Sequence, residues 1–169
     1  SLPREKVVVS TKVPLAGGHS DNVKVMTPAE VRESVERSLK RLDMEYVDVL
    51  LMAVADPKYF APVMNDDLPV LEALKQEGKI RFLGSSEQTR SDGSQKWLQA
   101  IIPTDVLDVV MAGHNMINQS AQRTIFPLCI EQNVGVVNVF TVRNLFWNPK
   151  RLKEVLSDLS DRGKVSRKN

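Results

Sequence analysis

The chain has 169 residues, 42% of them apolar and 26% charged, so it can bury a sizeable core and does not have the composition of a disordered segment. Its 23 lysines and arginines nearly balance its 21 aspartates and glutamates, which argues against nucleic acid as the main partner. No apolar run is long enough to span a membrane, and the N-terminus lacks the apolar stretch of a secretory signal. The single cysteine, Cys129, excludes an internal disulfide and favours the cytoplasm or another reducing intracellular compartment.

Five apolar segments rich in β-branched residues predict buried strands along the chain. They are near-continuous apolar runs, as in a parallel sheet that is covered on both faces. The predicted strands lie at residues 6–12, 46–53, 80–86, 106–113 and 134–142.

Helical periodicity follows each predicted strand. The clearest helix spans residues 28–42, because Thr27 and Glu30 form a capping-box pattern around a proline at the first helical position. The remaining helices are expected to end at Gly78, to span about 95–102, to lie within 120–133 with the regular part beginning at Pro127, and to begin after Asn148.

Five such βα units fit two architectures. One is a complete five-stranded, flavodoxin-like, doubly wound sheet. The other is part of a TIM (β/α)8 barrel, in which about 31 residues per unit give about 155 residues for five units. Periodicity does not separate the two, and length alone favours the complete sheet. No linker or change of composition interrupts the chain, so we expect residues 1–169 to form a single α/β domain or an incomplete barrel segment.

Several segments of the chain resemble the aldo-keto reductase family, and they follow one another in the same order as in that family. The family's third strand, its fourth strand with the helix before it, the approach to its fifth strand, and its sixth and seventh strands are matched in turn. The matching residues are 7–12 (VVVSTK), 33–42 with 46–50 (ESVERSLKRL and YVDVL), 74–84 (LKQEGKIRFLG), 109–119 and 126–143. The resemblance implies a partial TIM barrel, from the third to the seventh βα unit, and we adopt it over the flavodoxin-like sheet.

The resemblance also implies catalytic residues, which are an Asp, a Tyr, a Lys and a His in this family. Lys12 stands at the lysine position, where an ammonium would lower the pKa of the phenol that donates the proton. The Asp and Tyr come from the end of the family's second strand, whereas this chain begins at the third. Ala53 replaces the histidine and cannot hydrogen-bond a carbonyl group.

Cofactor-binding positions are implied in the same way. Ser86 and Glu87 stand where a Ser-Asn pair holds the nicotinamide carboxamide, and an ionised Glu87 offers only acceptors. His114 and Asn115 stand where a Tyr-Asn pair is usual, with the tyrosine stacking on the nicotinamide ring. The phosphate-binding residues of the family's eighth unit would lie beyond Asn169. We therefore expect NADP(H) binding by this chain to be weak or absent.

Each of these residues also has a structural interpretation. Lys12 could be an ordinary ion-pair partner, His114 a loop histidine, and Ser85–Ser86 the start of a turn that caps the next helix. His19 and His114 are too far apart in sequence to suggest a metal site. Cys129, between apolar neighbours on a helix, is expected to be a buried, unreactive thiol.

These residues and the resemblance leave two functions of different classes open. One is an oxidoreductase, or a segment of one, that reduces a small carbonyl substrate with NADPH. The other is a catalytically inactive relative that acts as a structural or assembly subunit, as Ala53 and the missing Asp, Tyr and phosphate site suggest.

Five units cannot close an eight-stranded barrel, so the strands at 6–12 and 134–142 should be open edges. Val7–Val9 and Val136–Val139 carry no protecting lysine or proline within these predicted strand cores. We expect the edges to be covered by flanking barrel segments, by another subunit, or by a second copy of the chain.

Overall fold

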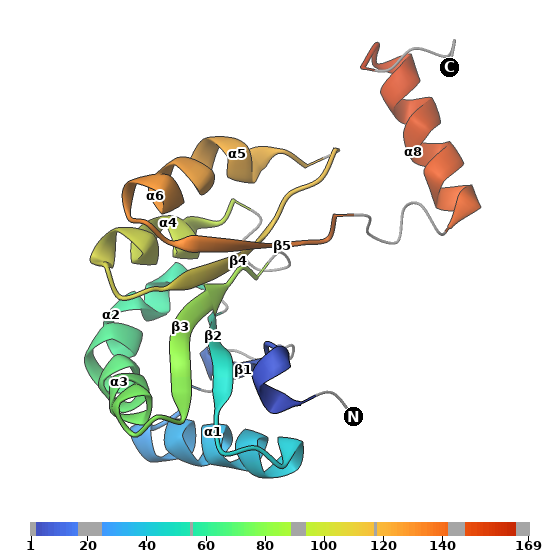
Figure 1. The fold of residues 1–169 in the computed structure, drawn as a ribbon. Coiled ribbons are helices and arrows are strands. Elements are labelled where there is room, and N and C mark those ends of the chain that lie inside the picture. The colour runs from blue at the N-terminus through green and yellow to red at the C-terminus, as the bar shows by residue number, and fades with distance from the viewer. Residues whose placement is uncertain are drawn as a thin grey trace. The chain divides into compact units, whose positions relative to one another are not determined.

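The computed structural model describes residues 3–16, 25–54, 56–88, 94–116, 118–141 and 148–164. It divides into two compact units, Ser1–Val139 and Phe140–Asn169 (Figure 1). Every helix among the described residues is too short or too polar to cross a membrane. The expected single domain over residues 1–169 stays a prediction.

The larger unit contains one parallel sheet of five strands in the order β1-β2-β3-β4-β5. This sequential order is that of neighbouring strands in a barrel, whereas a flavodoxin-like sheet has its second strand outside its first. The partial TIM barrel is therefore confirmed, and the flavodoxin-like alternative is wrong. The strands are β1 (Ser10–Ala16), β2 (Val47–Val54), β3 (Ile80–Ser86), β4 (Val109–Gly113) and β5 (Gly135–Val139).

The helices of this unit lie along one side of the sheet (Figure 1). They are α1 (Pro28–Leu42), α2 (Phe60–Pro62), α3 (Leu68–Gln76), α4 (Lys96–Ile101), α5 (Ser120–Thr124) and α6 (Phe126–Glu131). Short 3-10 turns at Arg4–Lys6, Pro57–Tyr59 and Ile102–Thr104, and a π-helical turn at Val63–Asp67, complete it. The smaller unit contains α8 (Pro149–Asp161), which begins at the predicted Asn148 cap.

Helix α1 has the bounds that the sequence predicts, because its first turn is capped as expected. The Thr27 hydroxyl accepts a hydrogen bond from the Glu30 N–H at 3.3 Å, and the Glu30 carboxylate accepts one from the Thr27 N–H at 2.8 Å. The apolar face of the helix, with Val31 and Val35 buried, packs against β1.

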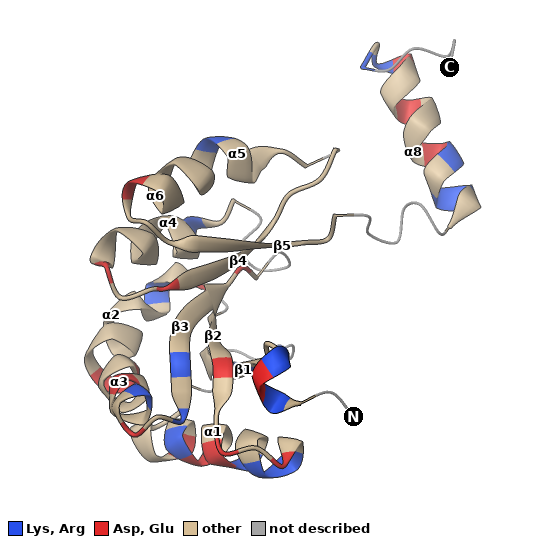
Figure 2. Cartoon of the chain, viewed as in Figure 1, with Lys and Arg blue, Asp and Glu red and all other residues tan. Residues whose placement is uncertain are grey.

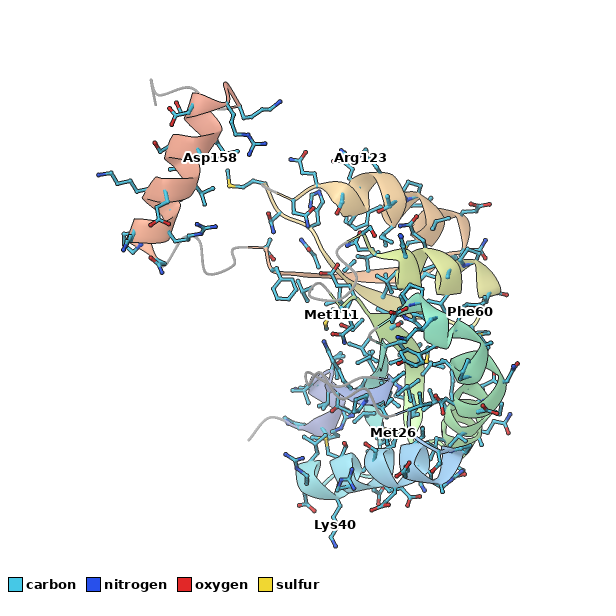
Figure 3. The ribbon with its side chains drawn as sticks, turned by 180° about the vertical axis from the view of Figure 1, so that it is seen from behind. Met26, Lys40, Phe60, Met111, Arg123 and Asp158 are labelled. Atoms are coloured by element: carbon cyan, nitrogen blue, oxygen red, sulfur yellow. The ribbon has the colours of Figure 1, made fainter. Side chains whose placement is uncertain are left out.

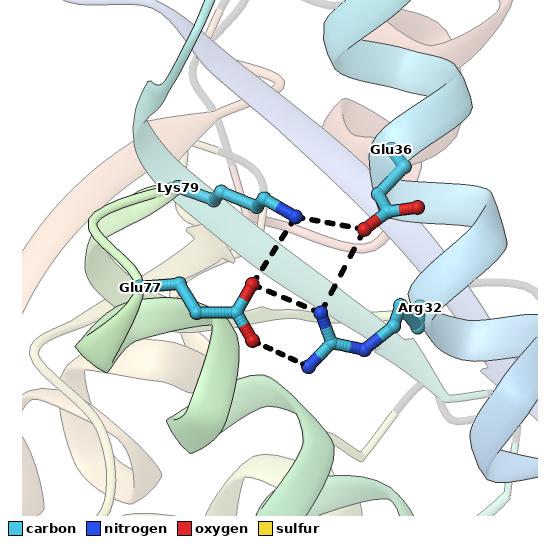
Figure 4. Close-up of polar contacts among 4 residues, drawn as sticks. All are labelled: Arg32, Glu36, Glu77 and Lys79. Atoms are coloured by element: carbon cyan, nitrogen blue, oxygen red, sulfur yellow. Dashed lines mark hydrogen bonds and ion pairs between the residues drawn. The ribbon is translucent and has the colours of Figure 1, made fainter.

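Four charged side chains connect α1 to the turn between α3 and β3 (Figure 4). The Arg32 guanidinium donates to both oxygens of Glu77, at 2.9 and 2.7 Å. Lys79 donates to Glu36 at 2.7 Å and pairs with Glu77 at 3.1 Å. Charges of both signs also lie scattered over the helices (Figure 2). Such exposed pairs contribute little singly, so this network positions α1 more than it stabilises the fold.

The first strand begins later than predicted. β1 spans Ser10–Ala16 rather than 6–12, since the preceding residues form the Arg4–Lys6 turn and an extended segment joined to Asp48. The Asp48 carboxylate accepts a hydrogen bond from the Val9 N–H at 2.8 Å. It thereby takes the place of the backbone carbonyl that a neighbouring strand would supply. Lys12 and Pro14 therefore lie within the edge strand, and the expectation that its core carries no protecting lysine or proline is wrong.

Asp48 is 3% exposed and joins three segments at the amino ends of the strands. Besides the Val9 N–H, it binds Arg4 at 2.7 Å and Arg81 at 2.9 Å. Burial by itself would raise the pKa of this carboxyl, but the Val9 hydrogen bond and the two guanidinium groups outweigh it and hold the pKa below its usual value. The buried charge is thus fully paired.

Later elements also differ from expectation. β4 begins at Val109 rather than at 106, because the Asp108 carboxylate takes the Leu83 N–H at 2.7 Å and the Lys75 ammonium at 2.5 Å. The helical segment predicted at 120–133 is divided at Ile125 into α5 and α6, and α6 begins at Phe126, next to the Pro127 at which regular helix was expected. The last strand is shorter than the predicted 134–142, because β5 spans Gly135–Val139 and Phe140 has a left-handed backbone with φ of 58°. Residue 142 itself lies outside the described residues.

Because side chains alternate along a strand, the parallel register sorts the sheet into two faces. One face packs under the helices. On the other face, no described helix of the larger unit covers the sheet, and Phe82 and Val137 remain 46% and 43% exposed. This inner face carries two rows of paired positions, Lys12–Leu51–Gly84–Val109 and Pro14–Ala53–Ser86–Met111.

Because Gly84 has no side chain, Leu51 and Val109 can pack close to its backbone on the inner face of the sheet. A Cβ atom there would lie 2.5 Å from the Val109 carbonyl oxygen and 2.7 Å from the Leu51 side chain. We expect Gly84→Ala to destabilise the fold by about 1–3 kcal/mol, measured by urea unfolding of the purified chain. Gly135→Ala is the control, since its nearest contact would be 3.5 Å, and equal losses in both variants would contradict the prediction.

Asp67, at the end of the π-helical turn, is a buried carboxyl group of a different kind. It is 1% exposed, and neither of its oxygens has a hydrogen-bond partner among the described residues. Burial, together with the charge of Asp66, raises its pKa from 3.8 to about 6.

A raised pKa means that the folded state holds this proton more tightly than the unfolded state. Folding stability contributed by Asp67 should therefore fall as the pH rises from about 4 to above 6. We expect Asp67→Asn to gain stability relative to the wild type over this window, by about 1–3 kcal/mol at pH 7, in urea unfolding at several pH values. Asp66→Asn should change less, and parallel pH profiles of wild type and Asp67→Asn would refute the prediction.

Candidate functional site

The carboxyl ends of the parallel strands bring Lys12 and Ser86 together. Ser86 is the last residue of β3 and is paired with Ala53 of β2, whereas Lys12 lies one row lower, opposite Leu51. The lysine stem spans this difference, because its Nζ donates a hydrogen bond to the Ser86 Oγ at 2.9 Å. The expected gathering of these two residues at one rim is therefore present.

The electrostatic environment of Lys12 has two opposing parts. Burial lowers the pKa of its ammonium, since a charge loses hydration there, and the negative charge of Glu87 acts in the opposite direction. The net result is a pKa below the ordinary value of 10.5. A partly desolvated cation at the rim is a group that can polarise a neighbouring hydroxyl.

Glu87 is held in place across two strands and a helix start. Its N–H donates to the Met111 carbonyl at 2.9 Å, and its Oε2 accepts the Gly113 N–H at 2.8 Å and the Gln95 amide at 2.5 Å. Gln95 is 3% exposed and has a left-handed backbone with φ of 59°. The sequence analysis missed Gln95, because nothing in its local pattern marks an αL position before α4.

Ser85 and Ser86 are not a helix cap, so that interpretation is wrong. Both are strand residues of β3, and both are buried. The Ser85 hydroxyl accepts a hydrogen bond from the Trp97 indole at 2.8 Å and donates to the Met52 carbonyl at 3.3 Å. These bonds place the Ser85 hydroxyl on the side of the sheet that the helices cover. Ser86 is therefore the serine of the pair that belongs to the rim.

His114 and Asn115 are bound within the segment that follows β4. The His114 N–H donates to the Asn138 side-chain oxygen at 3.0 Å, and its ring lies 5.2 Å from that of Phe126, at the start of α6. The Nε2 of His114 is buried without a hydrogen-bond partner among the described residues. Asn115 closes a turn with Asn118 through two hydrogen bonds of 2.9 Å. The stacking and cofactor-binding roles expected of this pair stay predictions.

Ala53 lies in the rim row between Pro14 and Ser86. It is 7% exposed, and its methyl group can neither donate nor accept a hydrogen bond. Next to it along the chain, Asp56 accepts the Lys58 N–H at 2.8 Å and caps the 3-10 turn that begins at Pro57. The position that the resemblance gives to a catalytic histidine is thus an apolar part of the rim.

The described rim residues do not by themselves fit a nicotinamide cofactor. Ser86 is 1% exposed, and its hydroxyl already accepts from Lys12 and donates to the Glu87 carbonyl at 3.3 Å. The Glu87 carboxylate already accepts from Gly113 and Gln95. A carboxamide would have to displace these bonds in order to reach either residue.

Metal and thiol chemistry find no support among the described residues. These residues contain no cluster of His, Cys, Asp and Glu that could hold a metal ion, and His19 lies outside them. Cys129 is 3% exposed, and burial raises the pKa of its thiol, as expected of an unreactive core cysteine.

Comparison with known proteins agrees with this fold. A model of the aldo/keto reductase family matches residues 1–160. The NADH-specific methylglyoxal reductase of Escherichia coli (strain K12) is 30% identical over 151 residues, which cover 83% of this chain and 44% of that protein. The L-galactose dehydrogenase of Arabidopsis thaliana is 28% identical over 138 residues, which cover 81% of this chain and 41% of that protein.

Solved structures show the same fold. A thermostable aldo-keto reductase in complex with the inhibitor epalrestat matches with a TM-score of 0.67 and 19% identity, over 96% of this chain and 54% of that one. The glycerol dehydrogenase of Gluconobacter oxydans matches with a TM-score of 0.60 and 23% identity, over 92% of this chain and 54% of that one.

The sheet and its rim thus define a segment of a parallel β/α barrel. The chain belongs to the aldo/keto reductase family, whose members named above are oxidoreductases. It spans less than half the length of these curated relatives and about half of the similar solved structures.

Proposed function

We propose that this chain is the lysine-bearing part of an oxidoreductase of the aldo-keto reductase type that reduces a small carbonyl compound with NADP(H). The observation that carries the proposal is the Lys12 ammonium at the carboxyl rim, 2.9 Å from the Ser86 hydroxyl. Active sites of β/α barrels are built at this rim. The buried, unreactive Cys129 suits a reducing intracellular compartment as the place of this activity.

Lys12 supplies the electrostatic part of this function. Its hydrogen bond to Ser86 shows that the ammonium reaches a neutral hydroxyl at the level of the strand ends. A phenol brought within the same reach would be made more acidic, and so a better proton donor to a carbonyl oxygen. By family resemblance the phenol comes from an earlier βα unit, and the phosphate-binding groups come from an eighth one.

Ala53 favours a second candidate, a catalytically inactive structural or assembly subunit. The row Pro14–Ala53–Ser86 offers no imidazole to polarise a substrate carbonyl. The bonds already made by Ser86 and Glu87 also oppose cofactor entry. In this alternative the Lys12–Ser86 contact holds β1 to β3 and has no chemical role.

Carbonyl reduction by the native polypeptide that contains this chain separates the two candidates. We expect oxidation of NADPH that depends on a small dicarbonyl such as methylglyoxal, and a loss of about 100-fold or more in Lys12→Met, since the polarising charge is removed. NADH is tested in parallel, with Lys40→Met, an exposed lysine of α1, as the control.

For residues 1–169 alone we expect no saturable binding of NADPH in titration calorimetry, and no turnover in the Ala53→His variant.

In the native polypeptide, wild-type turnover that Lys12→Met leaves unchanged would refute the lysine-dependent site. An assembled but inactive native protein would favour the structural subunit.

We further propose that the inner face and the two edge strands are covered by other barrel segments, from the same polypeptide or from a second subunit. Val136 and Val137 of the edge strand β5 are 41% and 43% exposed, as is expected of a sheet that continues beyond them. At the other edge, Lys12 and Pro14 give β1 partial protection.

Sedimentation of the purified 169-residue chain tests this proposal. We expect association at tens of micromolar, because apolar side chains and unpaired strand groups would remain in water. Val137→Lys should reduce the association, whereas Val8→Lys, an exposed residue before β1, should change it less. A cooperatively folded monomer at that concentration would contradict the proposal.

A further inference from the structure

The hydrogen bond between Lys12 and Ser86 crosses a strand. Lys12 lies on β1 and Ser86 on β3, and β2 lies between them in the sheet. Neighbouring strands are about 4.8 Å apart, so the two residues are separated by up to about 9–10 Å across the sheet. Ser86 also lies one row further along the strands, which adds about 6–7 Å in that direction. The lysine stem must therefore be well extended for its Nζ to lie 2.9 Å from the Ser86 Oγ.

Two residues of β2 flank this crossing on the inner face. Leu51 is paired with Lys12, and Ala53 is paired with Ser86. Leu51 fills its own row, since a Cβ atom at Gly84 would lie 2.7 Å from its side chain. Ala53 carries only a methyl group. The stem of Lys12 therefore has to pass beside Ala53 in order to reach Ser86.

The burial of Ala53 agrees with such a path. It belongs to the face on which no described helix of the larger unit covers the sheet, and Phe82 on the same face is 46% exposed. Ala53 is nevertheless only 7% exposed. A side chain that lies over the methyl group accounts for this difference, and the Lys12 stem crosses the sheet at that place. A longer side chain at position 53 would occupy the same space.

The Ser86 hydroxyl is oriented to receive the ammonium. It is 1% exposed, and its one proton is donated to the Glu87 backbone carbonyl at 3.3 Å. A hydroxyl has two lone pairs besides its proton, so the fixed proton leaves acceptor sites for the Lys12 Nζ. The acceptor is thus held in one direction by its own backbone segment.

These two bonds oppose the cofactor role that the resemblance gives to Ser86. A carboxamide oxygen would need the hydroxyl proton, which is bonded to the Glu87 carbonyl. A carboxamide NH2 would compete with the Lys12 ammonium for the lone pairs. The charged donor makes the stronger hydrogen bond to a neutral acceptor.

We propose that Ser86 is a positioning residue for Lys12 rather than for a cofactor, and that Ala53 admits the lysine stem across β2. The inference rests on the proposed function for the use of the positioned ammonium, but its test does not. A histidine at position 53, which the resemblance would restore, displaces the Lys12 stem instead of completing a site.

A thiol in place of the Ser86 hydroxyl reports whether the ammonium lies beside it. The thiolate of Ser86→Cys is titrated by ultraviolet absorbance in the native polypeptide that contains this chain, and the signal of the same protein with Ser86 intact is subtracted. We expect a midpoint about one pH unit lower than in Ser86→Cys combined with Lys12→Met, or about tenfold more thiolate below the midpoint, because a nearby ammonium stabilises a thiolate. Lys40→Met, which changes an exposed lysine of α1, is the control and should leave the midpoint unchanged.

A second set of variants tests the path beside Ala53. Ala53→Leu, combined with Ser86→Cys, blocks the path without adding a charge, so it should raise the thiol midpoint to the value found with Lys12→Met. Ala53→Ser is the matched control, because it keeps the side chain small and should keep the lower midpoint. Ala53→Val replaces Ala53→Leu if the larger residue prevents folding, which circular dichroism shows.

Equal thiol midpoints with and without Lys12 overturn the role of Ser86. A midpoint that stays low in a folded Ala53→Leu or Ala53→Val variant overturns the role of Ala53. If Ser86→Cys does not fold, acetylation of Lys12 relative to Lys40 decides the matter. Ser86→Ala should raise this ratio about threefold, since the ammonium loses its acceptor, and an unchanged ratio is negative. The proposed function fails separately, because absent carbonyl reduction together with a Lys12-dependent thiol midpoint would leave this positioning contact intact.

Discussion

The parallel register of β1, β2 and β3 is the constraint on which the rim depends. In parallel strands all carboxyl ends lie at one edge, and side chains two residues apart share a face. Lys12 is therefore placed opposite Leu51, one row below Ser86, at a height from which its stem reaches the hydroxyl. A shift of β1 by one residue would turn Lys12 toward the helices and remove this contact.

The two ends of the sheet use buried charge in different ways. At the amino ends, Asp48 is saturated by two guanidinium groups and a backbone N–H, so its charge is used in joining segments. At the carboxyl ends, the Glu87 carboxylate accepts from the Gly113 N–H and the Gln95 amide, and the Lys12 ammonium donates to the Ser86 hydroxyl. The first arrangement stabilises the fold, whereas the second places charged groups at the rim. This division is the usual one in β/α barrels.

The inner face of the sheet is protected unevenly. Gly84 lets Leu51 and Val109 close over the centre of the sheet, and Leu51 is only 1% exposed. Toward β5 the protection ends, since Val136 and Val137 are exposed on opposite faces of the strand. The curated relatives are more than twice as long as the part that this chain matches. The helix layer thus covers most of this sheet, while the inner face toward β5 is exposed.

The sequence by itself determined the elements whose signals are local. The capping box at Thr27 and Glu30 set the start of α1, and the apolar runs gave β2 and β3 within one residue of their bounds. Family resemblance added the strand order and the candidate lysine. Asp48 within an apolar run is itself a sign that cations lie near it, and the exposed Arg81 of the next strand is one of them.

Only the tertiary structure decided where β1 begins, what Ser85 binds, and how Glu87 is held. Each of these depends on groups far away in sequence: Val9 bonds to Asp48, Ser85 to Trp97 and Met52, and Glu87 to Gln95 and Gly113. Local propensity does not contain such contacts, because they exist only after the strands are aligned. The sequence could name the rim residues, but their partners follow from the register that packing selects.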